Sequence, residues 1–128
     1  MSNIEELALL AAEAGYALAF DVPYEVVMEA RRGLELRRRF GRGGLTPAQA
    51  RAVGVHSGLS RARQLAAGKP LSLHDVKRMS AYFSRHAKDK LAPRFHDAQR
   101  PSNGAIAWAL WGGDPALDFV NGILGKPV

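Results

Sequence analysis

The chain has 128 residues, no cysteine and a formal net charge of +6. This size fits one domain, and the absence of cysteine excludes disulfides, thiolate catalysis and cysteine-based zinc sites. Hydrophobic residues make up 47% of the chain and charged residues 23%, a balance typical of a folded protein, and no apolar run reaches the roughly 18 residues that a membrane span requires.

The charge is distributed unevenly along the sequence. Residues 1–30 contain six acidic residues and no Lys or Arg, whereas residues 31–90 contain fifteen Lys and Arg against three acids, an excess of twelve positive charges. Residues 91–128 are balanced. The asymmetry indicates either a polyanionic partner or an acidic segment that folds back on the basic one, and the sequence leaves both open.

The first helix is predicted from Asn3 to Phe20, where apolar residues recur at three- and four-residue intervals. We therefore expect residues 1–22 to form an acidic N-terminal helix that packs beside the basic middle of the chain, residues 23–90. A second helix is predicted to begin after Asp21, with Pro23 in its first turn, and to end at the glycines of residues 41–44.

The basic middle, residues 23–90, continues with three shorter predicted helices. Each follows a residue whose side chain can accept a backbone N–H at a helix N-terminus, and these residues are Thr46, Ser57 and Ser72. Ser72 with Asp75 three residues later resembles a capping box.

Residues 91–101 are predicted to form a loop, and residues 102–125 two helices that contain both tryptophans. Ser102 is the expected cap of the first helix and Asp114 that of the second. We therefore predict an all-α protein, a single domain over residues 1–128, built as a compact bundle of six or seven short helices with a C-terminal αα-corner.

The excess of Lys and Arg in residues 31–90, called the basic block below, is the strongest functional signal, because clustered Lys and Arg neutralise phosphates and release counterions. The alternative is a solvated helical face that the acidic segment partly neutralises. Arg61 and Arg63 are predicted to lie on the exposed side of their helix. The candidate nucleic-acid-binding residues are Arg37, Arg38, Arg39, Arg42, Arg61, Arg63, Lys77 and Arg78.

The remaining polar and aromatic residues give no catalytic pattern. The four histidines, His56, His74, His86 and His96, have no metal-ligand spacing. Trp108 and Trp111 lie three residues apart, which suits a stacking platform for bases, but the aliphatic residues around them favour core packing. We expect a non-enzymatic protein with no metal and no cofactor.

Four segments carry a resemblance to known proteins. They are RGLELR (32–37) with GRGG (41–44), SRARQLA (60–66), KRM (77–79) with YFSRH (82–86), and IAWALWGGD (106–114). Together they resemble a small helical module of tailed-bacteriophage and prophage proteins that has no assigned biochemical role. Ala109 and Phe119 depart from the pattern, at positions that often hold a larger aliphatic residue and a tryptophan. The resemblance implies an accessory module in a phage context. The acidic residues near the N-terminus, where a signal peptide would be basic, and the lack of a long apolar run predict a location in the host cytoplasm or the virion.

The leading hypothesis is a non-enzymatic phage-associated module that binds nucleic acid, more readily DNA, through a basic helical surface. The first alternative is a virion structural or assembly protein that contacts capsid or tail subunits. The second is an inhibitor of a host nucleic-acid-binding factor. The sequence indicates no oligomeric state.

Overall fold

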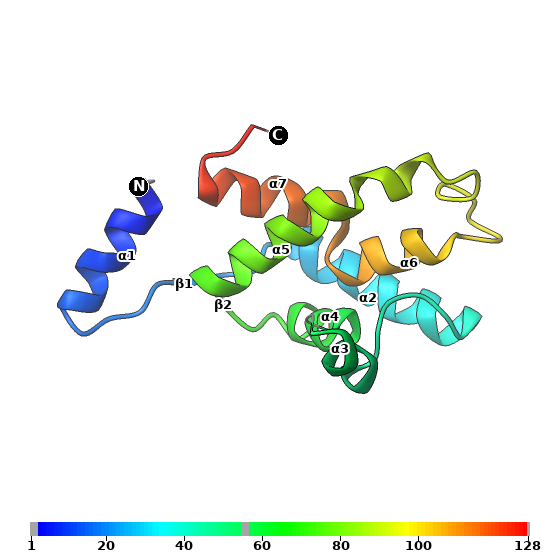
Figure 1. The fold of residues 1–128 in the computed structure, drawn as a ribbon, viewed down its shortest axis with the longest axis horizontal. Helices are drawn as coiled ribbons and strands as arrows, with labels where there is room; N and C mark the ends of the chain where they lie inside the picture. Colours follow the sequence, from blue (N-terminus) through cyan, green and yellow to red (C-terminus); the bar gives the residue numbers. More distant parts are fainter. Residues whose placement is uncertain (1–2, 55–56, 128) are drawn as a thin grey trace.

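The computed structural model describes residues 3–54 and 57–127. Within them the chain forms seven α-helices, one 3-10 helix and one pair of two-residue strands (Figure 1). The all-α fold class is therefore confirmed. The elements in chain order are α1 (Asn3–Glu13), β1 (Ala19–Phe20), α2 (Tyr24–Phe40), α3 (Pro47–Val53), α4 (Gly58–Ala66), β2 (Leu71–Ser72), α5 (Leu73–His86), η1 (Ala87–Leu91), α6 (Asn103–Leu110) and α7 (Gly113–Leu124).

The first helix is shorter than predicted. It ends at Glu13 because Gly15 adopts a φ of +87°, and the N–H of Tyr16 donates to the carbonyl of Ala11 at 2.8 Å. These features are typical of a helix C-terminus. The chain then runs to β1, which pairs antiparallel with β2 through Ala19–Ser72 and Phe20–Leu71, a strand pair that the sequence did not predict.

α1 stands apart from the other helices (Figure 1). It buries none of its residues, and an ion pair of 3.1 Å joins its Glu5 to Lys77 of α5. In Figure 1 it lies at the opposite end of the molecule from the C-terminal end of α2. The acidic helix therefore touches the basic middle at α5 and does not cover the arginine-rich end of α2.

α2 is the central helix and packs against α4, α6 and α7. Its buried residues Val26, Ala30 and Gly33 recur at helical spacing on one face. A Cβ at Gly33 would lie 2.5 Å from the backbone nitrogen of Leu110, so the absence of a side chain there allows α2 and α6 to approach closely.

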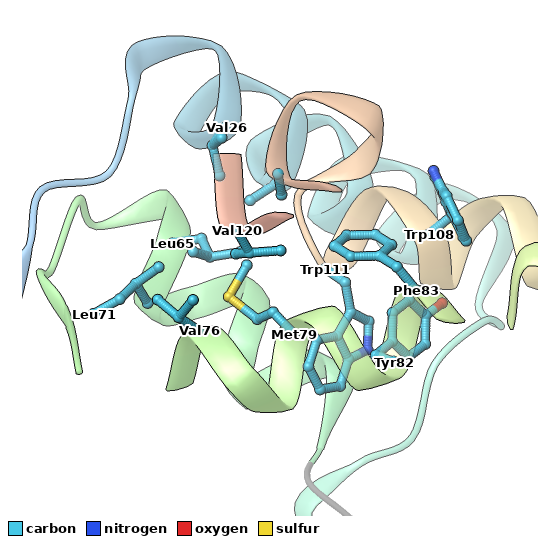
Figure 2. Close-up of a cluster of buried hydrophobic side chains, with 12 residues drawn as sticks. Val26, Leu65, Leu71, Val76, Met79, Tyr82, Phe83, Trp108, Trp111 and Val120 are labelled. Atoms are coloured by element: carbon cyan, nitrogen blue, oxygen red, sulfur yellow. The ribbon is translucent and has the colours of Figure 1, made fainter. Parts of the chain in front are cut away.

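The main hydrophobic core joins α2, α4, α5, α6 and α7 (Figure 2). Both tryptophans belong to it, Trp108 with 4% and Trp111 with 5% of its surface exposed. Core packing of the tryptophans is thus confirmed. Within the described helices, none is both long and apolar enough to cross a membrane.

Most of the predicted caps are present. Thr46 and Ser72 each form a reciprocal capping box, with Gln49 and Asp75 respectively. The hydroxyl groups of Ser57 and Ser102 also accept backbone N–H groups at the starts of α4 and α6. These bonds satisfy donors that the helices leave open, which explains why the helices begin at these positions.

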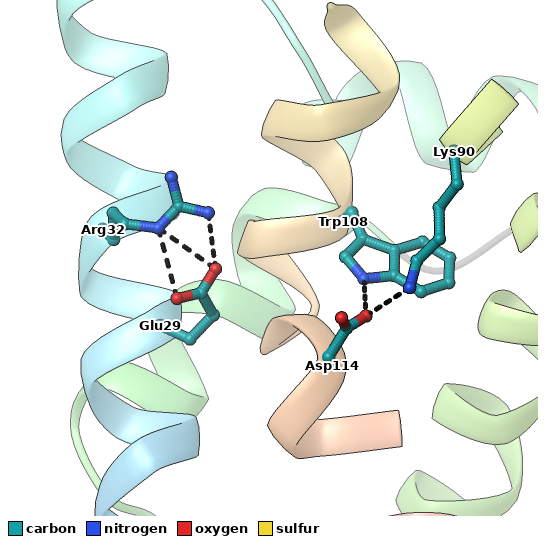
Figure 3. A network of polar contacts seen from close by, with 5 residues as sticks. All are labelled: Glu29, Arg32, Lys90, Trp108 and Asp114. Atoms are coloured by element: carbon teal, nitrogen blue, oxygen red, sulfur yellow. Dashed lines mark hydrogen bonds and ion pairs between the residues drawn. The ribbon is translucent and has the colours of Figure 1, made fainter. Parts of the chain in front are cut away.

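Asp114 does not cap α7 as predicted. Gly112, with a φ of +98°, is the N-cap, so α7 begins one residue before Asp114. The Asp114 carboxylate instead accepts hydrogen bonds from Trp108 Nε1 at 2.9 Å and from Lys90 Nζ at 2.6 Å (Figure 3). Burial alone would raise the pKa of this carboxyl, but these bonds outweigh it and the pKa is lowered.

Candidate functional site

The predicted arginines at the end of α2 do not form one uniform surface. Arg38 pairs with Glu35, with 2.8 Å between Nε and Oε2. Arg39 is exposed and its guanidinium carbon lies 5.2 Å from the ring centre of Phe40. Arg37 is half-buried, and its Nε is buried without a hydrogen-bond partner among the described residues. Arg39 is therefore the exposed arginine of this run that forms no ion pair with the described residues.

Arg42 has a structural role. Its guanidinium donates to the carbonyl of Pro101 and to Asn103 Oδ1, each at 2.7 Å. It also lies over the ring of Phe40, at 5.5 Å from the ring centre. These contacts tie the loop after α2 to the N-terminus of α6.

The prediction that Arg61 lies on the exposed side of its helix is wrong. Its side chain is fully buried, because the face of α4 that carries Arg61 and Leu65 packs inward. Arg61 Nη1 lies 2.9 Å from Asp75 Oδ1 and 2.6 Å from Gln64 Oε1. The guanidinium also lies 5.5 Å from the ring of Trp111. Arg61 therefore stabilises the interior and does not reach a phosphate in this fold.

The other three predicted residues are exposed but point to different places. Arg63 lies on the exposed surface of α4. Lys77 faces α1, where it pairs with Glu5. Arg78 is exposed and lines a groove. The structure thus separates residues that are close in sequence, because successive residues of a helix point about 100° apart.

This groove is a hollow of about 670 Å³ between α5, the loop after α2 and the N-terminus of α6. Its size falls in the range of small-molecule sites. The residues that line it are Gly43, Gly44, Leu45, Gly54, Gly58, Arg78, Ala81, Tyr82, Arg85, His86, Asp89, Asn103, Gly104, Ala107 and Trp111. Arg42 contacts its rim through Asn103.

The basic side of the groove is formed by Arg78 and Arg85 of α5. They are seven residues apart, so they lie on the same face of the helix, with Ala81 between them. Arg78 donates to His74 Nε2 at 2.8 Å. Neither arginine forms an ion pair with a carboxylate of residues 3–54 or 57–127. Their charge is therefore directed to solvent.

The opposite side of the groove is rich in glycine. Gly43 and Gly44 follow α2, Gly58 begins α4 and Gly104 lies in the first turn of α6. A Cβ at Gly43 or Gly44 would lie 2.5 to 2.6 Å from the side chain of Ile106 or Leu110, so these two glycines let the loop after α2 pack closely on α6. The sequence showed the glycine run at residues 41–44 but not that it faces α5.

Three aromatic rings form the end of the groove. The Tyr82 ring stacks on Trp111 at 4.4 Å between ring centres and on His86 at 4.5 Å. Tyr82 and Trp111 are almost fully buried, whereas 41% of the His86 side chain is exposed. His86 is therefore the member of this aromatic stack that is open to solvent.

Two polar groups accompany the aromatic stack. His86 Nδ1 lies 3.0 Å from Asp89 Oδ2, which orients the imidazole ring. The Tyr82 hydroxyl is buried and has no hydrogen-bond partner in the described part of the chain. Burial, reinforced by the negative charge of Asp89, raises the pKa of Tyr82, so this hydroxyl stays protonated and is a hydrogen-bond donor.

A second hollow, of about 550 Å³, lies beside Trp108. Three of its charged residues form ion pairs, Arg32 with Glu29 and Asp114 with Lys90 (Figure 3). The carboxylate of Asp97 accepts the backbone N–H groups of Gln99 and Arg100. The hydrogen bond from Arg32 Nη2 to Glu29 Oε1 is 2.6 Å long. These charges serve the fold, so the first groove is the better candidate site.

The sequence missed Arg85, His86 and Asn103 as members of the site. The seven-residue spacing of Arg78 and Arg85 was a signal that could have found one of them. Asn103 had no such signal, because it reaches the groove through the packing of α6. Among the described residues, no three His, Asp or Glu side chains group as a metal site, and His56 lies outside those residues.

The comparisons with known proteins add no family or function. No family model matches the chain, and neither a curated protein nor a solved structure matches it.

Proposed function

We propose that the chain binds nucleic acid, and that it does so through phosphate contacts along the groove rather than through the whole basic block. The observation that carries the proposal is the pair Arg78 and Arg85, which flank a hollow and form no ion pair with a carboxylate of the described chain. Guanidinium groups that lack such a counter-charge can bind phosphate oxygens without first breaking an ion pair.

The rest of the basic surface extends this site. Arg42 reaches the rim of the groove through Asn103, and Arg39 lies on the same end of α2 beside Phe40. A phosphate backbone that runs along the groove and past the C-terminal end of α2 would meet positive charge on both sides of the groove. Arg61, Arg63 and Lys77 lie outside this path, so they are not part of the proposed interface.

The test is fluorescence anisotropy of labelled DNA with the purified chain, at salt concentrations from about 0.05 to about 0.2 M. The chain is compared with the double variant R78A/R85A. Each lost phosphate contact reduces the slope of log affinity against log salt by about 0.9 for duplex and about 0.7 for single strands. The double variant should therefore bind more weakly and with a slope reduced by about twice these values.

The matched control is R63A/K77A. It removes the same net charge from exposed positions that do not line the groove. The control should retain most of the affinity and of the salt slope. Equal losses in both double variants would show that net charge alone drives binding, and would remove the groove from the proposal.

A second candidate function is assembly with phage structural proteins, capsid or tail subunits in the phage context that the resemblance implies. It is favoured by α1, which buries no residue and exposes Leu7, Leu9 and Leu10 by more than half of their surface. Exposed apolar helices often mark protein interfaces. The expected result is a fixed number of copies in purified particles, reduced by the double variant L7E/L10E. Particles that lack the chain would contradict this function.

A further inference from the structure

The groove has the dimensions of a site for one nucleotide rather than for a duplex. Its volume of about 670 Å³ lies in the range that encloses a single small ligand. A base in a duplex is stacked and paired, so it can enter such a hollow only after it leaves the stack, at a cost of a few kcal/mol. A base in a single strand or an overhang does not pay the cost of unpairing.

The groove also offers groups for the phosphate of that nucleotide. Arg78 and Arg85 line one side. The start of α6, a helix of eight residues, forms another side. Its first two residues, Asn103 and Gly104, line the groove, whereas its N-cap Ser102 does not. Backbone N–H groups at a helix N-terminus and its dipole favour an anion. The two features lie on the wall of the same hollow.

For the base, the groove offers an aromatic ring face. The exposed imidazole of His86 ends the stack with Tyr82 and Trp111. Aromatic faces of this kind bind bases of any sequence by stacking. The buried Tyr82 hydroxyl, which has no partner in the described residues, belongs to a residue of the groove wall. The hydroxyl itself is buried, so the ring face of His86 is the contact that the groove offers to a base.

We infer that the groove binds one unpaired nucleotide of a single strand, with its phosphate between Arg78 and Arg85 and its base against His86. This inference rests on the proposed function and makes it specific, because it predicts a preference for single strands and overhangs over blunt duplex.

The experiment uses a substitution that partly fills the groove and leaves the net charge of the chain unchanged. Ala81 is exposed and lies in the groove wall between the two arginines, so A81L places a larger side chain in the hollow. The matched control is S84L, an exposed position of the same helix that does not line the groove. Circular dichroism and thermal melting establish that both variants are folded.

Anisotropy is measured with a single strand, a blunt duplex and a duplex with an overhang. A81L should weaken binding to the single strand and the overhang by about tenfold or more, from lost stacking, and leave blunt-duplex binding unchanged. S84L should change none of the three. A mononucleotide should compete with the single strand better than inorganic phosphate does.

The outcomes separate the two proposals. Equal affinity for single strand and duplex, with no effect of A81L, would overturn the nucleotide site and leave phosphate binding along the surface intact. Equal competition by inorganic phosphate and mononucleotide would reduce the groove to an anion site and overturn the role of His86. Failure of all three DNA forms to bind at low salt would refute the proposed function itself.

Discussion

Replacing Asp75 by alanine is expected to lower the free energy of unfolding by about 3 to 5 kcal/mol, because it leaves a buried arginine without its counter-charge. The Arg61 side chain has no exposed surface, and its Nη1 lies 2.9 Å from Asp75 Oδ1. Its Nε and Nη2 already lack hydrogen-bond partners among the described residues. Among residues 3–54 and 57–127, Asp75 is the acid with which Arg61 forms an ion pair.

Two control variants separate the ion pair from other effects. Asp75 also belongs to the capping box of α5, where its carboxylate accepts the N–H of Ser72 at 3.1 Å. Ser72→Ala removes the other half of this box and should cost about 1 kcal/mol. Arg61→Met replaces the charge by an apolar side chain of similar length, and should stay within about 1 kcal/mol of the unmodified chain, since Asp75 keeps access to water.

The same pair predicts a loss of stability in acid. Burial would raise the pKa of Asp75, but its bonds to the Ser72 N–H and to Arg61 outweigh burial and lower the pKa from 3.8 to about 2. The unfolded chain then binds the proton at a higher pH than the folded chain does. About 2 kcal/mol of stability, present above about pH 4, should therefore be lost as the pH falls toward about 2. Asp75→Asn should lack this contribution.

The assay is urea unfolding followed by tryptophan fluorescence, since Trp108 and Trp111 are both buried in the core. Asp75→Ala should move the midpoint to much lower urea than Ser72→Ala does. Equal midpoints for these two variants would show that the cap, not the ion pair, accounts for the cost. An Arg61→Met variant as unstable as Asp75→Ala would refute the argument from an uncompensated buried charge.

Three further variants test the packing. Gly33→Ala should lower the free energy of unfolding by about 1 to 3 kcal/mol in urea titrations, because its Cβ would lie 2.5 Å from the backbone of Leu110. Gly122→Ala on α7 has no atom within 4 Å of the new Cβ and should raise that free energy by about 0.5 to 1 kcal/mol. A lower free energy of unfolding for this variant would contradict the absence of neighbouring atoms at Gly122. Deletion of residues 1–17 should change the unfolding free energy of the remaining chain by less than about 1 kcal/mol, because α1 buries no residue; a large drop in melting temperature would show that α1 supports the fold.

Local sequence patterns determined where most of the helices begin. Thr46, Ser57, Ser72 and Ser102 each cap a helix as predicted. A cap depends on a backbone N–H only three residues away, so the residues that decide it are adjacent in sequence. The core position of the tryptophans was also predictable, because apolar residues surround them within one helix.

Local patterns were less informative where a glycine or a pair of glycines redirects the chain. Gly15 ends α1 well before the apolar periodicity does. Gly112 takes the cap position predicted for Asp114. In both cases a positive φ, which the pattern of apolar residues does not record, set the boundary.

The candidate site was decided by tertiary structure. Arg61 and Arg78 belong to the same basic block in the sequence, yet packing of α4 buries the first against Asp75 and leaves the second in a groove. The groove combines α5 with Gly43 and Asn103, which are far apart in the chain. Composition shows how many positive charges the chain has, but which of them face solvent depends on how whole helices pack, because burial is a property of contacts between distant segments.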